Sequence, residues 1–423
     1  MPSYKLMYWN SRGRAESARM LFTLAGVAFE DYRFKEGEWP ELKGKKELFP
    51  LGQAPSLIID GKALPHSKAI NRHLAREFKL YGDDNEQRRQ VDVISETVDD
   101  IVSKIIPIHM EKDEAKKKEL LGELNEKTKP FLTFLSDNAG ERFFVGNKET
   151  LADVIVFWLL DFLVPMAPSV LTDYPRLGKF YNGIKDNSKL TEYLKNRPVT
   201  QNYRTSRTSR RSDAMSEHTY KLMYFNTTGR AEAARMLFAL KGVEFEDYRF
   251  KEGEWPEIKN DKKVFPLGQC PVLLIDGKPL PQCKAIIRHL AREFGFYGAN
   301  NAEAAEIDIV GETVDDIVAK ALPAAFEKDA EKKKTVIEDF RDNTSKPFLP
   351  YLNDMIERAG GRFFVGNTES VADITVFCLL DFIFSMLDNA RETYPALAKF
   401  HDGITENSRL SEYIKSRPPV PGM

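Results

Sequence analysis

Cysteine is scarce in this chain of 423 residues, and its scarcity excludes a disulfide-held fold. Only Cys270, Cys283 and Cys378 occur, so more than half of the chain has no cysteine. Their spacing does not match a Cys-based metal site, and we expect no bound metal. Because a disulfide-poor sequence is typical of a reducing compartment, we expect a cytoplasmic location.

An excess of charge of one sign and a long uninterrupted apolar run are also lacking. The 62 basic residues nearly balance the 64 acidic ones, and a net charge of -2 gives no field that attracts nucleic acid or an anionic membrane. No apolar stretch behind a basic start precedes Tyr8, so we expect no secretory signal. The most apolar segment, 151–171, contains Asp153 and Asp161, each of which would cost about 2.5–3.5 kcal/mol inside a bilayer. We expect no nucleic-acid partner and no membrane span, and we predict a buried helix here.

The sequence does contain a repeat of nearly its whole length. The segment DYRFKEGEWPE at 31–41 returns unchanged at 247–257, an offset of 216 residues. RFFVGN at Arg142 recurs at Arg362, an offset of 220, so we expect a small insertion in the second copy, in a loop near 354–361. Each copy is about 200 residues long, which is enough to fold around cores of its own.

Each copy begins with strands and helices and continues with helices alone. In the first copy the predicted strands are 4–9, 29–34, 55–59 and 62–64, and the predicted helices are 14–25 and 67–78. The first strand, helix and strand form a βαβ unit, and Asp60-Gly61 is a strong hairpin signal. This order, with a proline opening the third strand, is typical of a thioredoxin-like domain. From Asn85 onward only helical periodicity remains, and Thr150–Asp153 and Ser370–Asp373 have the pattern of helix capping boxes.

These patterns predict two tandem units, each a thioredoxin-like α/β domain followed by an all-α domain. We expect the thioredoxin-like domains at 1–81 and 219–297 and the all-α domains at 84–198 and 300–418. Residues 199–218 between them are rich in Ser, Thr and Arg and contain almost no large apolar side chain. This composition predicts a flexible basic linker that lets the two copies pack against each other.

Six segments of each copy resemble, in the same order, the cytosolic glutathione transferases of the sigma class. In the first copy they read YKLMYWNSRGRAESARMLF, EWPELK, PLGQAP, PHSKAI, ETVDDIV and TLADV. The resemblance covers both copies from end to end. It implies glutathione as cosubstrate and conjugation of its thiolate to small hydrophobic electrophiles. The class also includes haematopoietic prostaglandin D synthase and the S-crystallins, and its members are usually single copies that dimerise.

The resemblance implies a catalytic tyrosine at the end of the first strand of each copy. Tyr8 and Tyr224 match this residue, whose hydroxyl would donate a hydrogen bond to the glutathione sulfur and stabilise the nucleophilic thiolate. Lowering a thiol pKa of about 8.5 by two units requires roughly 2.7 kcal/mol, and one charge-assisted hydrogen bond supplies about 1.5–3 kcal/mol. Arg14 and Arg230 match the neighbouring arginine, which would support the hydroxyl and the thiolate electrostatically.

Further positions match the residues that hold glutathione in the family. They are Trp39, Lys43, Gln53, Ala54, Pro55, His66 and Ser67 in the first copy, and Trp255, Lys259, Gln269, Cys270, Pro271, Gln282 and Cys283 in the second. The resemblance assigns the glycyl end to the tryptophan and lysine, the cysteinyl part to the residue before a cis-proline, and the γ-glutamyl carboxylate to the following helix start. Cys283 replaces the serine of the first copy, and a thiol is a weak donor, so we expect a weaker second site.

In dimeric relatives, an aspartate from the neighbouring subunit completes the glutathione site. The matching pairs are Asp99-Asp100 and Asp315-Asp316. We expect Asp100 to reach the second site and Asp316 the first. The chain would then be an intramolecular pseudo-dimer, in which the two copies take the place of two subunits.

Two other functions stay open. A prostaglandin-type isomerase belongs to the class, but such relatives carry a tryptophan after a proline where this chain has Ile108 and Ala324. A noncatalytic crystallin-like structural or binding protein also fits, because S-crystallins share the fold with most activity lost. The catalytic and binding residue types kept in both copies favour glutathione binding. Trp9 and Phe225 are candidates for electrophile pockets that differ between the copies.

Overall fold

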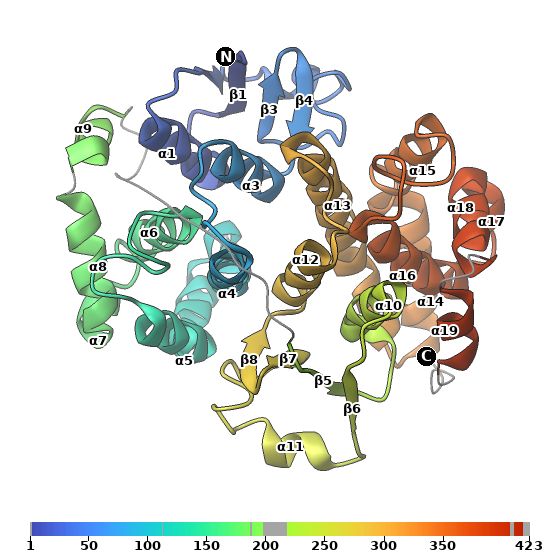
Figure 1. The fold of residues 1–423 in the computed structure, drawn as a ribbon. Helices are drawn as coiled ribbons and strands as arrows, with labels where there is room; N and C mark the ends of the chain where they lie inside the picture. The colour runs from blue at the N-terminus through green and yellow to red at the C-terminus, as the bar shows by residue number, and fades with distance from the viewer. Residues whose placement is uncertain (1, 112, 187, 198–217, 407–409, 418–423) are drawn as a thin grey trace.

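The computed structural model describes the whole chain except residues 1, 112, 187, 198–217, 407–409 and 418–423. The described residues form two similar units, one after the other along the chain (Figure 1). Of the predicted linker at 199–218, all but His218 lies outside the described residues, so the flexible connector stays a prediction.

The first unit begins with a four-stranded sheet of β1 (Tyr4–Trp9), β2 (Glu30–Phe34), β3 (Ser56–Ile59) and β4 (Lys62–Pro65). The strand order is β2-β1-β3-β4, with β1 parallel to β2 and β3 antiparallel to both of its neighbours. The helices of this part are α1 (Glu16–Ala25), α2 (Trp39–Leu42) and α3 (Ser67–Glu77). The predicted thioredoxin-like arrangement is confirmed.

The side chains of β1 alternate between two hydrophobic cores, one on each face of the sheet. Tyr4, Leu6 and Tyr8 join the cluster that contains α1 and α3, whereas Met7 packs with Phe34 in a separate cluster. This division follows because successive side chains of a strand point to opposite faces of the sheet. The alternation of side chains along β1 therefore directs Tyr8 toward α1 and α3, and only 8% of its surface is exposed.

The second unit repeats this sheet and its register. Its elements are β5 (Tyr220–Phe225), β6 (Glu246–Phe250), β7 (Val272–Ile275), β8 (Lys278–Pro281), α10 (Glu232–Lys241), α11 (Glu254–Ile258) and α12 (Cys283–Phe294). Tyr224 pairs with Arg249 of β6, as Tyr8 pairs with Arg33 of β2. The tyrosines of the two copies thus occupy equivalent positions.

Helices alone follow each sheet. In the first unit they are α4 (Asn85–Met110), α5 (Glu114–Asn138), α6 (Leu151–Leu163), α7 (Val170–Asp173), α8 (Pro175–Lys185) and α9 (Ser188–Asn196). The predicted capping box is present at the start of α6, where the backbone N–H of Thr150 donates to Asp153 with N and Oδ2 2.7 Å apart. Of the helices described, none combines the length and the apolar character that crossing a membrane requires.

The second unit continues with α13 (Asn301–Phe326), α14 (Ala330–Asp339), α15 (Leu349–Arg358), α16 (Val371–Met386), α17 (Ala390–Thr393), α18 (Pro395–Glu406) and α19 (Ser411–Ser416). A π-helical segment, Phe340–Thr344, directly follows α14. The sequence KPFL at 129–132 recurs at 346–349, an offset of 217, so one of the four extra residues enters before it. A single residue added to a helix commonly produces such a π-bulge.

The expectation of a loop near 354–361 is wrong for most of that segment. Residues 354–358 are the end of α15, and only the residues after Arg358 leave the helix. Three added residues make nearly one helical turn of 3.6 residues, so α15 lengthens while its buried face keeps its direction. An insertion that matches the helical period needs no loop.

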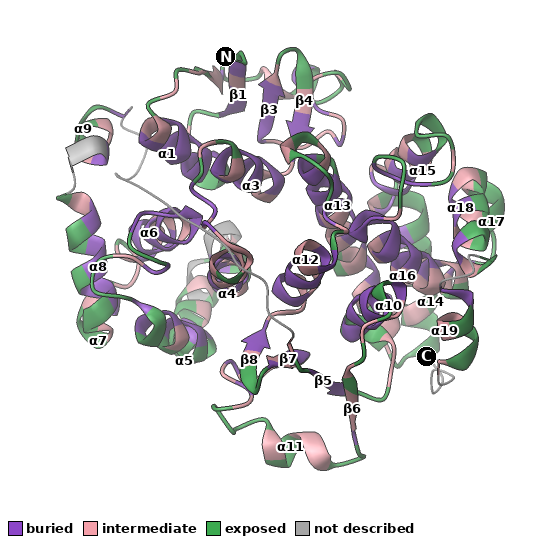
Figure 2. Cartoon of the chain, viewed as in Figure 1, coloured by how far each residue is buried: buried purple, intermediate pink, exposed green. Residues whose placement is uncertain are grey.

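The two units face each other through four helices. Helix α3 packs against α13, and α12 packs against α4 (Figure 1). The facing sides of these helices carry buried residues (Figure 2). The contact is built largely from charged side chains, which the two units contribute in matching positions.

The buried ion pairs between the units obey a pseudo-two-fold relationship. Arg72 Nε lies 2.7 Å from Asp308 Oδ1, and Arg288 Nε lies 2.9 Å from Asp92 Oδ1. Burial alone would raise the pKa of Glu96, but Lys68 and other cations from both units outweigh burial and lower it to about 2. The surrounding cations also lower the pKa of Asp308 and Glu312, so these buried carboxylates are held charged by partners of opposite sign.

Candidate functional site

The hydroxyl oxygen of Tyr8 accepts a hydrogen bond from the backbone N–H of Arg14, with N and Oη 3.2 Å apart. The second copy repeats this contact between Arg230 N and Tyr224 Oη at 3.3 Å. A phenol has one hydrogen and two lone pairs. Because a lone pair accepts the backbone bond, each hydroxyl keeps its own hydrogen for another acceptor.

A glycine makes this contact possible in each copy, and sequence reasoning did not single it out. Gly13 has φ +41°, and a Cβ added there would lie 2.5 Å from Tyr8 Oη. Gly229 has φ +45°, and its added Cβ would lie 2.9 Å from Tyr224 Oη. Both separations are shorter than atoms tolerate. The signal in the sequence was a glycine directly before the expected arginine in both copies.

The structure brings the backbone of Arg14 and Arg230 to the tyrosines and leaves both side chains exposed. Burial raises the pKa of the Tyr224 phenol, while the hydrogen bond from Arg230 and its charge oppose that rise. A phenol with a raised pKa is protonated at neutral pH and is therefore available as a donor.

Aromatic packing fixes the expected tryptophan, whereas the expected lysine is exposed. The ring of Trp39 stacks on Phe34 with centroids 5.2 Å apart, and Lys43 is the first residue after α2. Trp255 and Lys259 occupy the same places in the second copy. Among the described residues, neither lysine has an ion-pair partner, so both ammonium groups are available to a carboxylate.

The peptide bonds Ala54–Pro55 and Cys270–Pro271 are cis, as the resemblance implied. Each leads into the strand that pairs antiparallel with the tyrosine strand. Continuing the ladder from Met7 opposite Ser56 by one residue places Pro55 opposite Tyr8. The backbone before each cis-proline therefore lies beside the tyrosine strand.

Two polar residues stand at the start of the next helix with strained backbones. His66 has φ +63° and Gln282 has φ +73°, and each directly precedes the first residue of its helix, Ser67 or Cys283. Residues other than glycine rarely adopt positive φ, and such strain clusters at functional sites. His66 Nε2 lies 3.1 Å from the hydroxyl of Thr313 in the other copy. Burial lowers the pKa of His66, so its imidazole is neutral at neutral pH.

The second aspartate of each pair crosses to the other copy. Gln282 Nε2 donates to Asp100 Oδ2 at 2.9 Å, and Gln53 Nε2 donates to Asp316 Oδ2 at 3.4 Å. The first aspartate does not cross: Asp99 Oδ2 lies 2.7 Å from Lys68 Nζ of its own copy. The structure thus brings Asp100 to the expected site residues of the second copy, and Asp316 to those of the first.

Two thiols distinguish the second site from the first. Burial raises the pKa of Cys270 to about 12, and burial also raises the pKa of Cys283. Both thiols are therefore protonated at neutral pH and weakly nucleophilic. Across the described part of the chain, no three His, Cys, Asp or Glu side chains are grouped so as to hold a metal ion.

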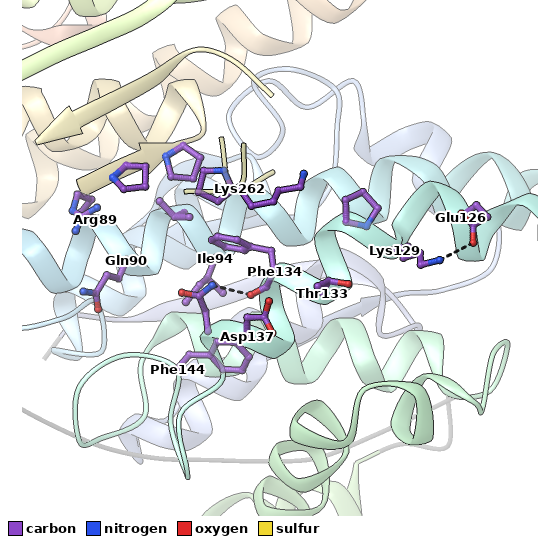
Figure 3. A pocket seen from close by; sticks show the side chains of 16 residues that line it. Arg89, Gln90, Ile94, Glu126, Lys129, Thr133, Phe134, Asp137, Phe144 and Lys262 are labelled. Atoms are coloured by element: carbon purple, nitrogen blue, oxygen red, sulfur yellow. Dashed lines mark hydrogen bonds and ion pairs between the residues drawn. The ribbon is translucent and has the colours of Figure 1, made fainter. Parts of the chain in front are cut away.

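A large pocket lies between the copies, away from the tyrosines. Its volume is about 760 Å³, and its walls include Arg89 and Phe134 of the first copy and Lys262 of the second (Figure 3). None of the residues expected in the glutathione sites lines it. The pocket belongs to the contact between the copies and not to either tyrosine site.

Comparison with known proteins identifies both parts of each unit. The model of the glutathione S-transferase N-terminal domain matches residues 4–76 and 220–292, and the model of the C-terminal domain matches residues 99–197 and 315–417. The first set of segments contains both tyrosines and both cis-prolines, and the second contains the aspartates that cross between copies.

Individual relatives match one copy at a time. S-crystallin 4 of Enteroctopus dofleini is 34% identical over 217 residues, which is 48% of this chain and 100% of that protein. Glutathione S-transferase 3 of Caenorhabditis elegans is 33% identical over 203 residues, which is 47% of this chain and 97% of that protein. A solved sigma class enzyme of Fasciola hepatica is 32% identical and covers 49% of this chain and 100% of its own, with a TM-score of 0.46. The chain belongs to the glutathione S-transferase family and carries two N-terminal and C-terminal domain pairs in tandem.

Proposed function

We propose that the chain conjugates glutathione to small hydrophobic electrophiles, with one tyrosine-based site in each copy. The observation that carries this proposal is the backbone hydrogen bond received by both Tyr8 and Tyr224, at 3.2 and 3.3 Å. It leaves each hydroxyl hydrogen free to point at a sulfur. A hydroxyl that donates to the thiolate and not to the thiol lowers the thiol pKa, which makes the nucleophile available at neutral pH.

The surrounding residues suit the glycyl, cysteinyl and γ-glutamyl parts of glutathione. Lys43 is exposed and suits the glycyl carboxylate, while the backbone of Ala54, before the cis bond to Pro55, would pair with the cysteinyl part. The start of α3 at Ser67 offers unsatisfied N–H groups to the γ-glutamyl carboxylate. These three groups come from one thioredoxin-like domain, and the second copy supplies their equivalents with Cys283 in place of Ser67.

We also propose that the two copies act as an intramolecular pseudo-dimer. The α-amino group of glutathione bound at Ser67 is cationic and needs a carboxylate partner. Asp316 supports this role, because it already lies within hydrogen-bond distance of Gln53 in the first copy. In the second copy Asp100 accepts a hydrogen bond from Gln282, the counterpart of His66, so it also lies beside an expected glutathione residue of the other copy. Each site would then need an acid from the other copy.

A noncatalytic role is the alternative for one or both copies. The S-crystallins among the relatives support it, and so do Cys270 and Cys283 in the second site. A copy of this kind would keep glutathione binding while turnover is lost. The alternative predicts that glutathione binds to two sites although only one tyrosine, or neither, affects the rate.

Conjugation of glutathione to chlorodinitrobenzene tests these possibilities. We would compare the wild type with Tyr8→Phe, Tyr224→Phe and the double variant, because Phe keeps the ring and removes only the hydroxyl. Loss of turnover in the double variant, with partial loss in each single variant, is expected. If the double variant keeps full activity, the tyrosine mechanism is wrong. If one single variant abolishes all turnover, the other copy is noncatalytic.

A further inference from the structure

In the first copy, helix α6 holds the turn that contacts Tyr8. Trp158 Nε1 donates to the carbonyl oxygen of Gly13 at 3.0 Å. Arg12 Nη1, one residue before Gly13, lies 3.3 Å from Asp161 Oδ2. Trp158 and Asp161 are three residues apart on α6 and therefore share a face of that helix. Two side chains of one helix face thus anchor the turn.

The peptide unit between Gly13 and Arg14 connects Trp158 to Tyr8. The carbonyl of Gly13 accepts from Trp158, and the N–H of Arg14 donates to Tyr8. Both groups belong to one planar peptide, in which C=O and N–H point in opposite directions. Fixing the carbonyl therefore fixes the direction of the N–H. Hydrogen bonds in a chain also polarise one another, by about 10–30% per bond.

The second copy lacks both anchors. Cys378 on α16 occupies the position of Trp158, and Thr228 occupies that of Arg12. Neither side chain has the indole or guanidinium group that holds the turn in the first copy. The thiol of Cys378 lies 3.6 Å from the sulfur of Met236 on α10. The backbone bond to Tyr224 is present without these supports.

We propose that Trp158 is a positioning residue for the Tyr8 site and has no counterpart in the second copy. By holding the Gly13–Arg14 peptide, it strengthens the hydrogen bond that Tyr8 receives and makes the Tyr8 hydroxyl a stronger donor to a bound thiolate. This inference rests on the proposed function. Its consequence is a functional difference between the copies, in which the first copy keeps its glutathione ionised to lower pH than the second.

The test uses the full chain with one tyrosine removed. In a Tyr224→Phe background, turnover comes from the first copy alone. Trp158→Phe then removes the indole N–H and keeps an aromatic ring at this position of α6. We expect the acidic midpoint of the kcat/KM profile to rise by about 0.3–0.5 pH unit, roughly a two- to threefold loss of thiolate below the midpoint. The KM for glutathione should stay unchanged.

Two further variants control for packing. Cys378→Ala in the Tyr224→Phe background removes the matching side chain of the other copy and should leave the midpoint where it was. Cys378→Trp in a Tyr8→Phe background offers the missing indole to the second copy and should lower that copy's midpoint. This second variant tests the inference even if Trp158→Phe does not fold.

The outcomes separate the inference from the proposed function. An active Tyr224→Phe parent whose midpoint does not move on Trp158→Phe would overturn the positioning role, even if the variant melts at a lower temperature. If Trp158→Phe lowers the melting temperature and leaves the midpoint unchanged, Trp158 has a structural role only. A Tyr224→Phe parent with no turnover would refute the proposed function for the first copy, and the inference would fall with it.

Discussion

Gln282 of the second copy donates a hydrogen bond to Asp100 of the first, with Nε2 and Oδ2 2.9 Å apart. In the other direction Asp316 accepts from Gln53, a different position of the first copy's site, with Nε2 and Oδ2 3.4 Å apart. Each acid lies on a long helix of one copy and each glutamine beside a tyrosine site of the other. The proposed sites are therefore interdependent, and an acid in one copy should affect catalysis in the other.

This crossed arrangement gives the first prediction. In a Tyr224→Phe chain only the first copy turns over, and Asp316→Asn should raise its KM for glutathione about tenfold. The reason is that one charge-assisted bond to the glutathione amine, worth about 1.5 kcal/mol or more, is weakened. Asp100→Asn in the same chain is the matched control and should change KM little. The measurement is initial rate against glutathione concentration. The opposite pattern would mean that each acid serves its own copy.

The second prediction concerns the close approach of Gly13 to Tyr8. Gly13→Ala places a Cβ 2.5 Å from Tyr8 Oη and must move the ring or the turn. We expect kcat/KM of the first copy, again in Tyr224→Phe, to fall at least about tenfold, because roughly 1.4 kcal/mol of thiolate stabilisation is lost. Gly37→Ala is the control, since Gly37 also has positive φ, at +76°, but an added Cβ meets no atom within 4 Å. Equal losses in both variants would assign the effect to backbone strain.

The strand and helix pattern of each copy was predictable because it depends on local periodicity and turns. The hairpin at Asp60-Gly61 and the capping box at Thr150 are examples, since neighbouring residues determine both. The repeat offset also predicted that Tyr224 is the counterpart of Tyr8. In the structure the two tyrosines pair with equivalent residues of the next strand, Arg249 and Arg33. The helix at 354–358 was not predictable from the change in offset alone. An insertion changes the offset by the same number of residues whether it lengthens a helix by about one turn or lengthens a loop.

The candidate site was predicted residue by residue only through the family resemblance. Sequence reasoning gave Arg14 a side-chain role, whereas the structure places its backbone N–H on Tyr8. A backbone donor leaves no mark on the residue type, so composition and spacing do not reveal it. Trp158 was also missed, because it lies 145 residues from Gly13 in the chain. Contacts of that separation require the folded arrangement of α6 against the turn.

The third prediction concerns the charged contact between the copies. Asp308 accepts hydrogen bonds from Arg72, Arg76 and Tyr297, and it is 3% exposed. Asp308→Ala leaves the buried guanidinium of Arg72 and the partly buried one of Arg76 without this partner, and we expect the free energy of unfolding to fall by about 3–5 kcal/mol. Urea unfolding followed by far-UV circular dichroism measures it. Glu41→Ala, which breaks an exposed pair with Lys45, should have little effect. A small loss at Asp308 would show that the contact contributes little to stability.

The last prediction is a pH dependence of stability that arises from a buried histidine. His289 is 4% exposed, and neither ring nitrogen has a hydrogen-bond partner among the described residues. Burial, assisted by the charge of Arg292, lowers the pKa of His289 to about 3. In the unfolded chain its pKa returns to about 6.5, so between these values the unfolded state binds a proton that the folded state does not.

The contribution of His289 to the free energy of unfolding is therefore fully present above pH about 6.5. It is lost progressively as the pH decreases toward 3. At pH 5 the expected loss is about 2 kcal/mol, because the unfolded imidazole is then almost fully protonated. His289→Phe keeps a ring and cannot titrate, so its free energy of unfolding should fall less than that of the wild type between pH 7 and 5. The difference between the two proteins isolates this histidine from the titrating carboxylates. Between pH 8 and 7 their pH dependence should be the same, and a difference there would assign the effect to packing.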